Sequence, residues 1–230
     1  MGDARVEARA VTKDYPRAGA SGGALTAVRP LDLELGPGSL TVVTGRSGSG
    51  KSTLLSMLAG MLAPTSGAVI LDGADLYSLD EKSRSRLRNA KIGLVPQGHT
   101  ALRALSVLDN VLLPAVLYSR ERPPRQRAEH LLEAVGIAEL ARVGPHELSG
   151  GELRRMAVAR ALLMDPVVVL ADEPTAGLDE ESAALVLELL RGAADDGAAV
   201  LVVTHEDGAA RFADRVLTMA DGRLGDPPAR

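Results

Sequence analysis

The sequence contains no cysteine, and aromatic residues make up only 2% of its 230 residues. Without cysteine the chain cannot form a disulfide, a thiolate zinc site or a catalytic thiol, and it fits a reducing compartment such as the cytosol. Because aromatic side chains are so scarce, the core must be built from Leu, Val, Ile, Ala and Met. Hydrophobic residues at 46% and charged residues at 24% predict one compact domain with a real core.

Long apolar runs and an excess of positive charge are also missing. No run approaches the roughly 18 residues needed to cross a bilayer, and the polar residues 1–9 predict no secretory signal. A role at a membrane would therefore be exerted from its surface, through a partner. The net charge of -4 argues against a nucleic-acid binder. Two basic stretches, 82–88 and 120–127, are expected to be a solvated helix face and a surface loop, with attraction to an anionic membrane as the alternative.

The first part of the chain has the periodicity of antiparallel strands. Val6, Ala8 and Ala10 alternate with polar neighbours, which predicts that they share one face of a strand. Residues 31–35 are also strand-like, and they end at a Gly-Pro-Gly turn signal, residues 36–38. We therefore expect an antiparallel sheet at the start of the chain.

Three short apolar runs follow, at residues 40–43, 167–170 and 199–203. They are rich in β-branched residues and too short for helices, which is typical of strands buried on both faces of a parallel sheet. Helical segments, including 52–62 and 182–190, separate them. This alternation predicts an α/β domain.

The middle of the chain, residues 107–164, has a helical pattern with no convincing strand. Near the C-terminus, residues 216–219 and 223–224 flank an Asp-Gly turn and predict a small hairpin. The expected organisation is a single domain, 1–230, made of an antiparallel portion (1–39), an α/β core (40–96 and 161–230) and an inserted helical subdomain (97–160).

The first buried strand leads into Gly-Arg-Ser-Gly-Ser-Gly-Lys-Ser, residues 45–52, which matches the P-loop pattern in full. In such a loop, glycines let backbone N–H groups surround a phosphate, and the following helix adds its positive end. Lys51 would reach the β- and γ-phosphates, and Ser52 would ligate Mg²⁺. We expect Lys51 to be an exposed loop residue. The alternative is a glycine-rich turn before a helix.

The other two buried strands also end in polar residues, and the carboxyl ends of such strands form the ligand site of an open α/β sheet. Asp172 and Glu173 follow one strand. Beside a P-loop, Asp172 would hold Mg²⁺ directly or through water, and Glu173 would accept a proton from the attacking water. Alternatively, Asp172 caps the turn before Pro174. His205 follows the other strand, where it would bond the γ-phosphate or position the water, or else have a structural role.

A P-loop is shared by kinases, GTPases, helicases and transporters, and one further motif separates them. Residues 148–152, Leu-Ser-Gly-Gly-Glu, open a predicted helix. Ser149 and Glu152 have the spacing of a capping box, which is the structural alternative. Gly150 and Gly151 at a helix start also make a second anion site. A second phosphate site in one chain makes sense when another subunit supplies the nucleotide.

With these motifs the chain resembles the ABC ATPases from end to end. Residues 148–152 correspond to the signature motif, and Gln97 corresponds to the glutamine of the Q-loop. Asp179 ends the segment that resembles the D-loop, and His205 resembles the switch histidine. Tyr15 most resembles the aromatic residue that stacks on adenine, with an ordinary surface or core tyrosine as the alternative.

Residues 170–175 and 105–114 are most similar to the lipoprotein-releasing, macrolide-exporter and cell-division branch of that family. The sequence departs from the branch at three places: Glu152 stands where the signature motif usually has Gln, Gly98-His99 follow Gln97, and Ala176-Gly177 precede Leu-Asp. None of these changes removes a catalytic group.

The resemblance implies a P-loop NTPase core with a mostly parallel sheet, and a homodimer that sandwiches two ATP molecules head to tail. Mg²⁺ would be held by Ser52, Gln97 and, through water, Asp172. Glu173, His205, Gln97 and Lys51 are the implied catalytic residues. The implied nucleotide-binding residues are Tyr15, Gly45, Arg46, Ser47, Gly48, Ser49, Gly50, Lys51, Ser52 and Thr53 of one subunit, with Ser149, Gly150, Gly151, Glu152 and Asp179 of the other.

The implied partner is a separate transmembrane permease, and no nucleic acid is expected to bind. The subunit would lie on the cytoplasmic face of the membrane and drive export or extraction of lipid-linked, peptide or drug-like cargo. The Leu-rich residues 102–117, just beyond Gln97, are expected to include the docking face for a permease helix. The alternatives are a cell-division-type ATPase that regulates a membrane partner and, less well supported, a P-loop kinase.

Overall fold

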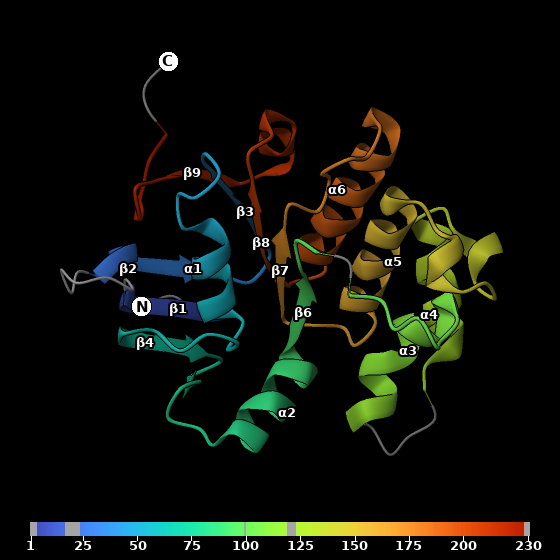
Figure 1. The fold of residues 1–230 in the computed structure, drawn as a ribbon, viewed down its shortest axis with the longest axis horizontal. Helices are drawn as coiled ribbons and strands as arrows, with labels where there is room; N and C mark the ends of the chain where they lie inside the picture. The colour runs from blue at the N-terminus through green and yellow to red at the C-terminus, as the bar shows by residue number, and fades with distance from the viewer. Residues whose placement is uncertain (1–3, 17–23, 99, 119–122, 228–230) are drawn as a thin grey trace.

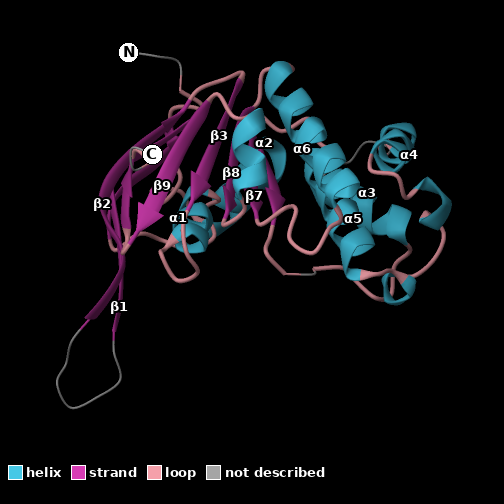
Figure 2. Ribbon diagram, turned by 90° about the horizontal axis from the view of Figure 1, so that it is seen from above, coloured by secondary structure: helices cyan, strands magenta, loops and turns pink. Residues whose placement is uncertain are grey.

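The computed structural model describes residues 4–16, 24–98, 100–118 and 123–227. Strands gather at one side of the molecule and most helices at the other, as the two ribbon views show (Figures 1 and 2). His99 and Arg120, both named above in sequence patterns, lie outside the described residues. No helix in the described ranges is long and apolar enough to cross a bilayer.

A four-stranded antiparallel sheet contains the first strands of the chain, as predicted. Its strands lie in the order β2-β1-β4-β5. The last two of these strands, from residues beyond the first 39, were not predicted. Their bounds are β1 (Val6–Pro16), β2 (Ala24–Leu35), β4 (Ser66–Leu71) and β5 (Ala74–Asp75).

The alternation predicted for the first strand is wrong at Ala10. Val6 and Ala8 are buried, whereas Ala10 is exposed and has a φ of 46°. The register of β1 shifts here against both neighbours, and the Ala10 N–H donates to Asp32 Oδ1 at 2.7 Å. Because a bulge inserts one extra residue, Val11 takes the buried position instead.

A six-stranded sheet carries the three apolar runs that were predicted to be buried strands. Its order is β10-β9-β3-β8-β7-β6, with every neighbouring pair parallel except the C-terminal hairpin. The α/β class, the mostly parallel sheet and the C-terminal hairpin are therefore confirmed, and only β6 was not predicted. The bounds are β3 (Ser39–Thr44), β6 (Ile92–Val95), β7 (Val168–Asp172), β8 (Ala199–Thr204), β9 (Arg215–Ala220) and β10 (Arg223–Gly225).

Six α-helices and three 3₁₀ helices complete the described fold. Between residues 107 and 164 the described residues form helices and no strand, as predicted. The basic residues 82–88 lie on α2. The α-helices are α1 (Lys51–Leu58), α2 (Glu81–Lys91), α3 (Val107–Tyr118), α4 (Arg125–Ala134), α5 (Gly150–Leu162) and α6 (Glu180–Asp195), and the 3₁₀ helices are η1 (Ala138–Leu140), η2 (Pro145–Glu147) and η3 (Asp207–Phe212).

Helix α1 ends earlier than the predicted residue 62. Gly60 has a φ of 68°, and the N–H groups of Gly60 and Met61 donate to carbonyls of the last turn. A glycine in this left-handed conformation closes a helix, because the orphan carbonyls find donors there. The division of the chain at residues 39, 96 and 160 stays a prediction.

The parallel strands share their side chains between two hydrophobic cores. On β8, Val200 and Val202 pack with helices α3 to α6, whereas Ala199, Leu201 and Val203 pack with α1 and the antiparallel sheet. All five side chains have 0% exposure. Helix α1 contacts strands of both sheets. The strand ends that face solvent are therefore fixed by packing on both faces of the sheet.

Candidate phosphate-binding and hydrolysis site

The P-loop joins β3 to α1, as expected. Gly50 precedes the helix with a φ of 108° and offers no side chain to cap it. The N–H groups of the first turn have no partner within the helix, and this leaves them for an anion. A Cβ at Gly50 would collide with the carbonyl oxygen of Ala27, so only glycine fits here.

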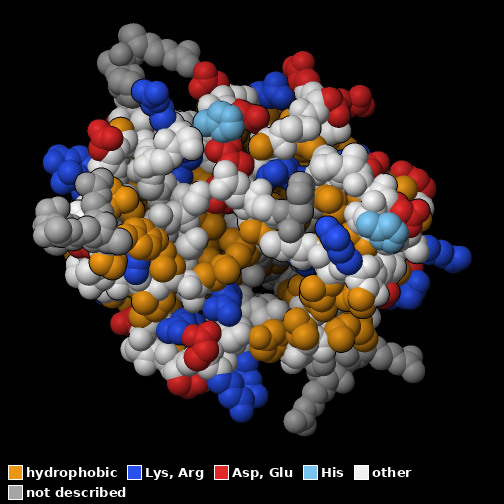
Figure 3. Space-filling view, viewed as in Figure 1, with side chains coloured by type: hydrophobic (Ala, Val, Ile, Leu, Met, Phe, Trp, Pro, Cys, Tyr) orange, Lys and Arg blue, Asp and Glu red, His pale blue; other side chains and the backbone are white. Residues whose placement is uncertain are grey.

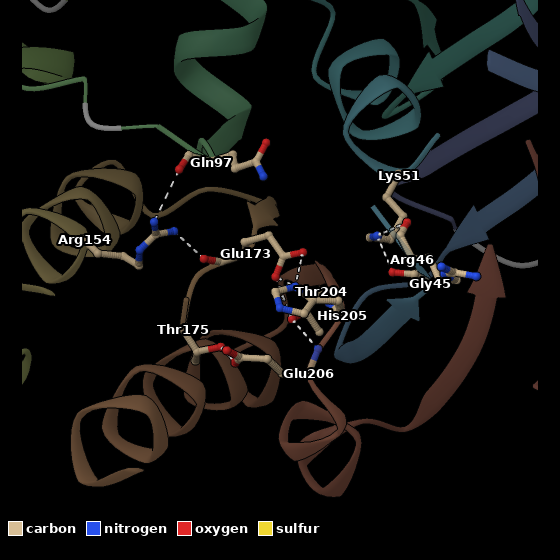
Figure 4. A network of polar contacts seen from close by, with 10 residues as sticks. All are labelled: Gly45, Arg46, Lys51, Gln97, Arg154, Glu173, Thr175, Thr204, His205 and Glu206. Atoms are coloured by element: carbon tan, nitrogen blue, oxygen red, sulfur yellow. Dashed lines mark hydrogen bonds and ion pairs between the residues drawn. The ribbon is translucent and has the colours of Figure 1, made fainter. Parts of the chain in front are cut away.

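The expectation that Lys51 is exposed is wrong. Only 6% of Lys51 is accessible, because it lies in the first turn of α1 beneath the loop. Its Nζ donates to the carbonyl oxygens of Gly45 at 2.6 Å and Arg46 at 3.1 Å (Figure 4). The loop thus holds a cation within it, next to the N–H groups that would bind phosphate.

The P-loop forms one wall of a cavity of about 750 Å³, which we call the phosphate cavity. Three other loops supply the opposite side, and they include Gln97, Glu173 and His205. The structure therefore brings the P-loop, Glu173 and His205, predicted at three strand ends, to one cavity, whereas Asp172 is not among the described residues that line it. The lining residues are Ala27, Arg46, Ser47, Gly48, Ser49, Gly50, Lys51, Ser52, Thr53, Gln97, Arg154, Glu173, Ala176 and His205.

Asp172 ends β7 and is only 5% accessible. Burial raises the pKa of Asp172, and a hydrogen bond with the Ser52 side chain opposes that rise. Its Oδ1 atom is buried without a hydrogen-bond partner among the described residues. The unpartnered Asp172 oxygen, the Ser52 hydroxyl and the Gln97 amide oxygen are of the kind that Mg²⁺ prefers, and Ser52 and Gln97 line the phosphate cavity. The residues present therefore fit a magnesium ion.

Both carboxylate oxygens of Glu173 have a partner, although the backbone of the residue is strained. Its φ is 51°, a left-handed conformation that costs roughly 1–2 kcal/mol for a non-glycine residue. The carboxylate accepts from Thr204 Oγ1 at 2.9 Å, and His205 Nδ1 lies 2.9 Å from its other oxygen. The Glu173 carboxylate raises the pKa of His205 by favouring the imidazolium form. A carboxylate and an imidazole are thus coupled at the edge of the phosphate cavity.

Ser149 and Glu152 form a complete capping box at the start of α5. The Ser149 hydroxyl and N–H donate to the Glu152 carboxylate at 2.8 and 2.7 Å, and these bonds lower the pKa of Glu152. The capping role weighed from the sequence is therefore real. It leaves Gly150 and Gly151 to line a cavity at the helix start.

This second cavity, the signature cavity, has a volume of about 450 Å³. Asp179 lies here, where it caps α6 by accepting from the Ser182 N–H and hydroxyl, and these bonds lower the pKa of Asp179. The structure therefore groups Asp179 with the signature residues, and none of them is among the described residues that line the phosphate cavity. The two cavities adjoin, because Arg154 and Ala176 line both. The lining residues are Ser149, Gly150, Gly151, Arg154, Arg155, Ala176, Gly177, Leu178, Asp179 and Ser182.

Tyr15 lies near the end of β1, with Lys13 Nζ 5.5 Å from its ring centroid. It is not among the described residues that line the phosphate cavity. Stacking of Tyr15 on adenine stays a prediction. Sequence reasoning missed two residues at the site: Thr204, which binds Glu173, and Arg154, which lies just beyond the signature motif and reaches Gln97 and Glu173.

A phosphate loop between a parallel strand and a helix, with acidic residues ending another strand of the same sheet, defines a P-loop nucleoside triphosphatase. The family model described as "ABC transporter" matches residues 28–176, and the chain belongs to this family. It is an ATP hydrolase that uses ATP and Mg²⁺.

Individual relatives match almost the whole chain. It is 43% identical over 216 residues to the lipoprotein-releasing system ATP-binding protein LolD 1 of Rhodopirellula baltica, covering 93% of each chain. It is 41% identical to LolD of Shewanella oneidensis, covering 99% of this chain and 98% of the relative. A dimeric bacterial ABC transporter cassette, MJ0796, has a TM-score of 0.89 at 32% identity, with 98% of this chain and 100% of that chain covered. The same cassette with ADP and Pi bound, in a post-hydrolysis state, has a TM-score of 0.89 at 33% identity, with the same coverage.

Proposed function

We propose that the chain drives a separate transmembrane permease, as a head-to-tail homodimer that sandwiches two Mg-ATP. The observation that carries this proposal is that the P-loop and the signature residues line two different cavities of one chain. The P-loop lines the phosphate cavity, whereas Ser149, Gly150 and Gly151 line the signature cavity. A helix start with free N–H groups binds phosphate, and the neighbouring subunit would supply that phosphate.

In this dimer each ATP would lie between the P-loop of one subunit and the signature residues of the other. Lys51 and the P-loop N–H groups would bind the phosphates, and Ser52, Gln97 and Asp172 would hold Mg²⁺. The ion would neutralise charge on the β- and γ-phosphates. Glu173 would polarise the attacking water, and His205 would orient the γ-phosphate. Because the site is complete only in the dimer, hydrolysis would follow closure.

The permease would dock beside the end of α3. Within residues 102–117, Val107, Leu108 and Val111 are core residues, whereas Val116 and Leu117 are 57% and 63% exposed. Met61, at 61% exposure, lines a groove with Pro114 and Tyr118 of α3. Hydrophobic side chains gather around a hollow on this face of the molecule (Figure 3). Only part of the Leu-rich stretch is therefore free to contact a permease helix.

The cargo proposed is lipid-linked, and its movement is extraction from the membrane. The support is the printed name of the relatives, lipoprotein-releasing system ATP-binding proteins, which this chain matches along 93% and more of its length. The subunit would work at the cytoplasmic face of the membrane. The alternative remains a cell-division-type ATPase that regulates a membrane partner, because such a subunit would carry the same motifs.

The partner decides between these two functions. The chain, affinity-tagged and carrying Glu173→Gln to stabilise the ATP-bound dimer, should be purified with Mg-ATP from detergent-solubilised membranes of its source cell, and the permease identified by mass spectrometry. The wild-type complex should then be reconstituted into vesicles with a lipid-modified peptide or the same peptide without lipid. We expect only the lipid-modified peptide to stimulate ATP hydrolysis and to leave the vesicle. A partner that moves neither peptide but activates a cell-wall hydrolase would establish the regulatory alternative.

A further inference from the structure

Arg154 lies on α5, just beyond the signature residues, and reaches two segments that are distant in the sequence. Its Nη1 donates to the carbonyl oxygen of Glu173, and its Nη2 donates to that of Gln97 at 3.3 Å (Figure 4). Arg154 also lines both the phosphate cavity and the signature cavity. One side chain therefore connects the helix of the signature motif to the backbone of two residues proposed to act on the nucleotide.

The geometry of these contacts depends on the guanidinium group. An arginine presents its donors in a rigid planar fork, so two acceptors fix its orientation, whereas a lysine ammonium is a point charge. The Nε of Arg154 is buried and has no partner among the described residues. Within the part of the chain that the structure describes, the side chain is thus oriented by its two carbonyl contacts, and no carboxylate pairs with it.

Glu173 needs such support because its main chain is in the left-handed region, with a φ of 51°. Its N–H donates to the Val203 carbonyl at 2.9 Å, and its own carbonyl accepts from the Ala176 N–H at 3.3 Å as well as from Arg154. Strained backbone at a functional site persists only where the surroundings over-determine it. The Arg154 contact is the one that comes from α5.

We propose that Arg154 is a positioning residue that makes the orientation of Glu173 depend on the position of the signature helix. This inference rests on the role proposed above for Glu173. When α5 moves relative to the parallel sheet, the Arg154 guanidinium moves with the helix. It then either shifts the Glu173 and Gln97 carbonyls or loses its hydrogen bonds to them. The signature residues of a subunit act on its neighbour's nucleotide in the proposed dimer, whereas Glu173 acts on its own. Arg154 therefore couples one ATP site to the other.

The test compares Arg154→Gln and Arg154→Lys with the wild-type chain in steady-state ATP hydrolysis and in a titration with a fluorescent ATP analogue. Lysine keeps the positive charge at the cavity but cannot engage both carbonyls in one plane. We expect kcat to fall roughly 10- to 100-fold in the Gln variant, because misplacement of a reacting group by about 1 Å has effects of that size. The Lys variant should fall at least severalfold, with KM and analogue affinity near wild type. Full recovery of kcat by lysine would show that charge alone suffices and would overturn the proposal.

Arg127 of α4 provides a control away from both cavities. It too reaches two backbone carbonyls of another segment, since its Nε donates to the Leu163 carbonyl at 2.9 Å and its Nη2 to the Leu162 carbonyl at 3.0 Å, and it lines neither the phosphate cavity nor the signature cavity. Arg127→Gln should lower the melting temperature about as much as Arg154→Gln while changing kcat less than about twofold, since its acceptors are remote from the nucleotide-binding residues. Equal losses of kcat in the two variants would mean that Arg154 is only a structural contact.

A third arm separates this inference from the proposed role of Glu173. If Arg154 acts through Glu173, adding Arg154→Gln to Glu173→Gln should slow hydrolysis no further, because residues that act as a unit are not additive. Normal turnover in Glu173→Gln alone would refute the base assignment and, with it, this inference. Slow turnover in Glu173→Gln together with an additional full loss from Arg154→Gln would refute the inference and leave the base assignment intact.

Discussion

The Nδ1 atom of His205 lies 2.9 Å from Oε1 of Glu173, so the proposed phosphate-orienting residue and the proposed base are joined directly within one subunit. Glu173 is buried, whereas the His205 side chain is 61% exposed. The histidine is therefore the partner that is free to turn toward a nucleotide, and the glutamate is the partner that the sheet holds in place.

This contact predicts a shifted titration of His205. Glu173 raises the pKa of His205 above its ordinary 6.5, and nearby Glu206 adds to the rise while Lys51 opposes it. The stabilisation from the pair is fully present below about pH 6.5 and is lost as pH rises through the higher, folded pKa. NMR titration should give a lower pKa for His205 in Glu173→Gln than in the wild type, with the other histidine signals unchanged. An identical His205 titration in the two proteins would contradict the contact.

Glu173→Gln should bind Mg-ATP but hydrolyse it about 10²- to 10⁴-fold more slowly, the usual contribution of a general base. Phosphate release at saturating ATP measures this, and a nucleotide titration shows that binding persists. Glutamine keeps the size of the side chain, so the melting temperature serves as the control for folding. If hydrolysis stays near normal, the base lies elsewhere, and His205 is the next residue to test.

Lys51→Ala should strongly weaken ATP hydrolysis and should also destabilise the fold. The buried ammonium group donates to the Gly45 and Arg46 carbonyls, and a hydrogen bond from a charged donor contributes about 1.5–3 kcal/mol to stability. Lys51→Arg keeps the charge and tests whether the geometry of the ammonium matters. Thermal melting and ATPase assays check both effects, and an alanine variant with unchanged turnover would refute the P-loop assignment.

Ser149→Arg, made in the Glu173→Gln background, should block ATP-dependent dimerisation. The parent should be monomeric without nucleotide and dimeric with Mg-ATP by light scattering, because hydrolysis no longer opens the sandwich. The arginine would fill the signature cavity, where the neighbour's γ-phosphate is expected, whereas ATP binding through Lys51 should survive.

Ser149→Ala is the matched control for that experiment. It removes the same hydroxyl cap, which is worth about 1 kcal/mol, without adding bulk. Its dimer should still form, at a higher ATP concentration than the parent requires. If the Ser149→Arg protein still dimerises when ATP is added, or if the parent never dimerises, the head-to-tail sandwich is excluded for this chain.

Single cysteines can map the permease surface cleanly, because the chain has none of its own. Cysteines at Leu102, Val116 and Leu117, which are 49%, 57% and 63% exposed, should crosslink to cytoplasmic loops of the permease. A cysteine at Val107, with 0% exposure, should not. Crosslinks confined to positions distant from α3 would place the docking face elsewhere.

The parts of the fold that sequence predicted best are those in which one local rule acts alone. The three apolar runs became β3, β7 and β8 because short β-branched segments buried on both faces have few other arrangements. The strands β4 (Ser-Gly-Ala-Val-Ile-Leu) and β6 (Ile-Gly-Leu-Val) escaped prediction although they are mostly apolar. Each contains a glycine, which weakens the strand pattern, and pairing with the neighbouring strands determines their conformation.

For the site, motif spacing predicted which strand ends meet but not how deep each side chain lies. Lys51 was expected to be an exposed loop residue, whereas its position in the first turn of α1 buries it. The local sequence around Arg154 does not indicate its contacts either. Its role depends on Gln97 and Glu173, which reach it through tertiary packing from 57 and 19 residues away in the sequence.

The alternation of β8 side chains between two cores has a consequence for how the protein unfolds. Because β8 contributes side chains to both cores, we expect disruption of one core to weaken the other. Loss of local order in the antiparallel sheet or in the helices around α5 would therefore disturb β8, and with it Thr204 and His205 at its end. A subunit with loosened packing should therefore lose ATP hydrolysis together with its stability.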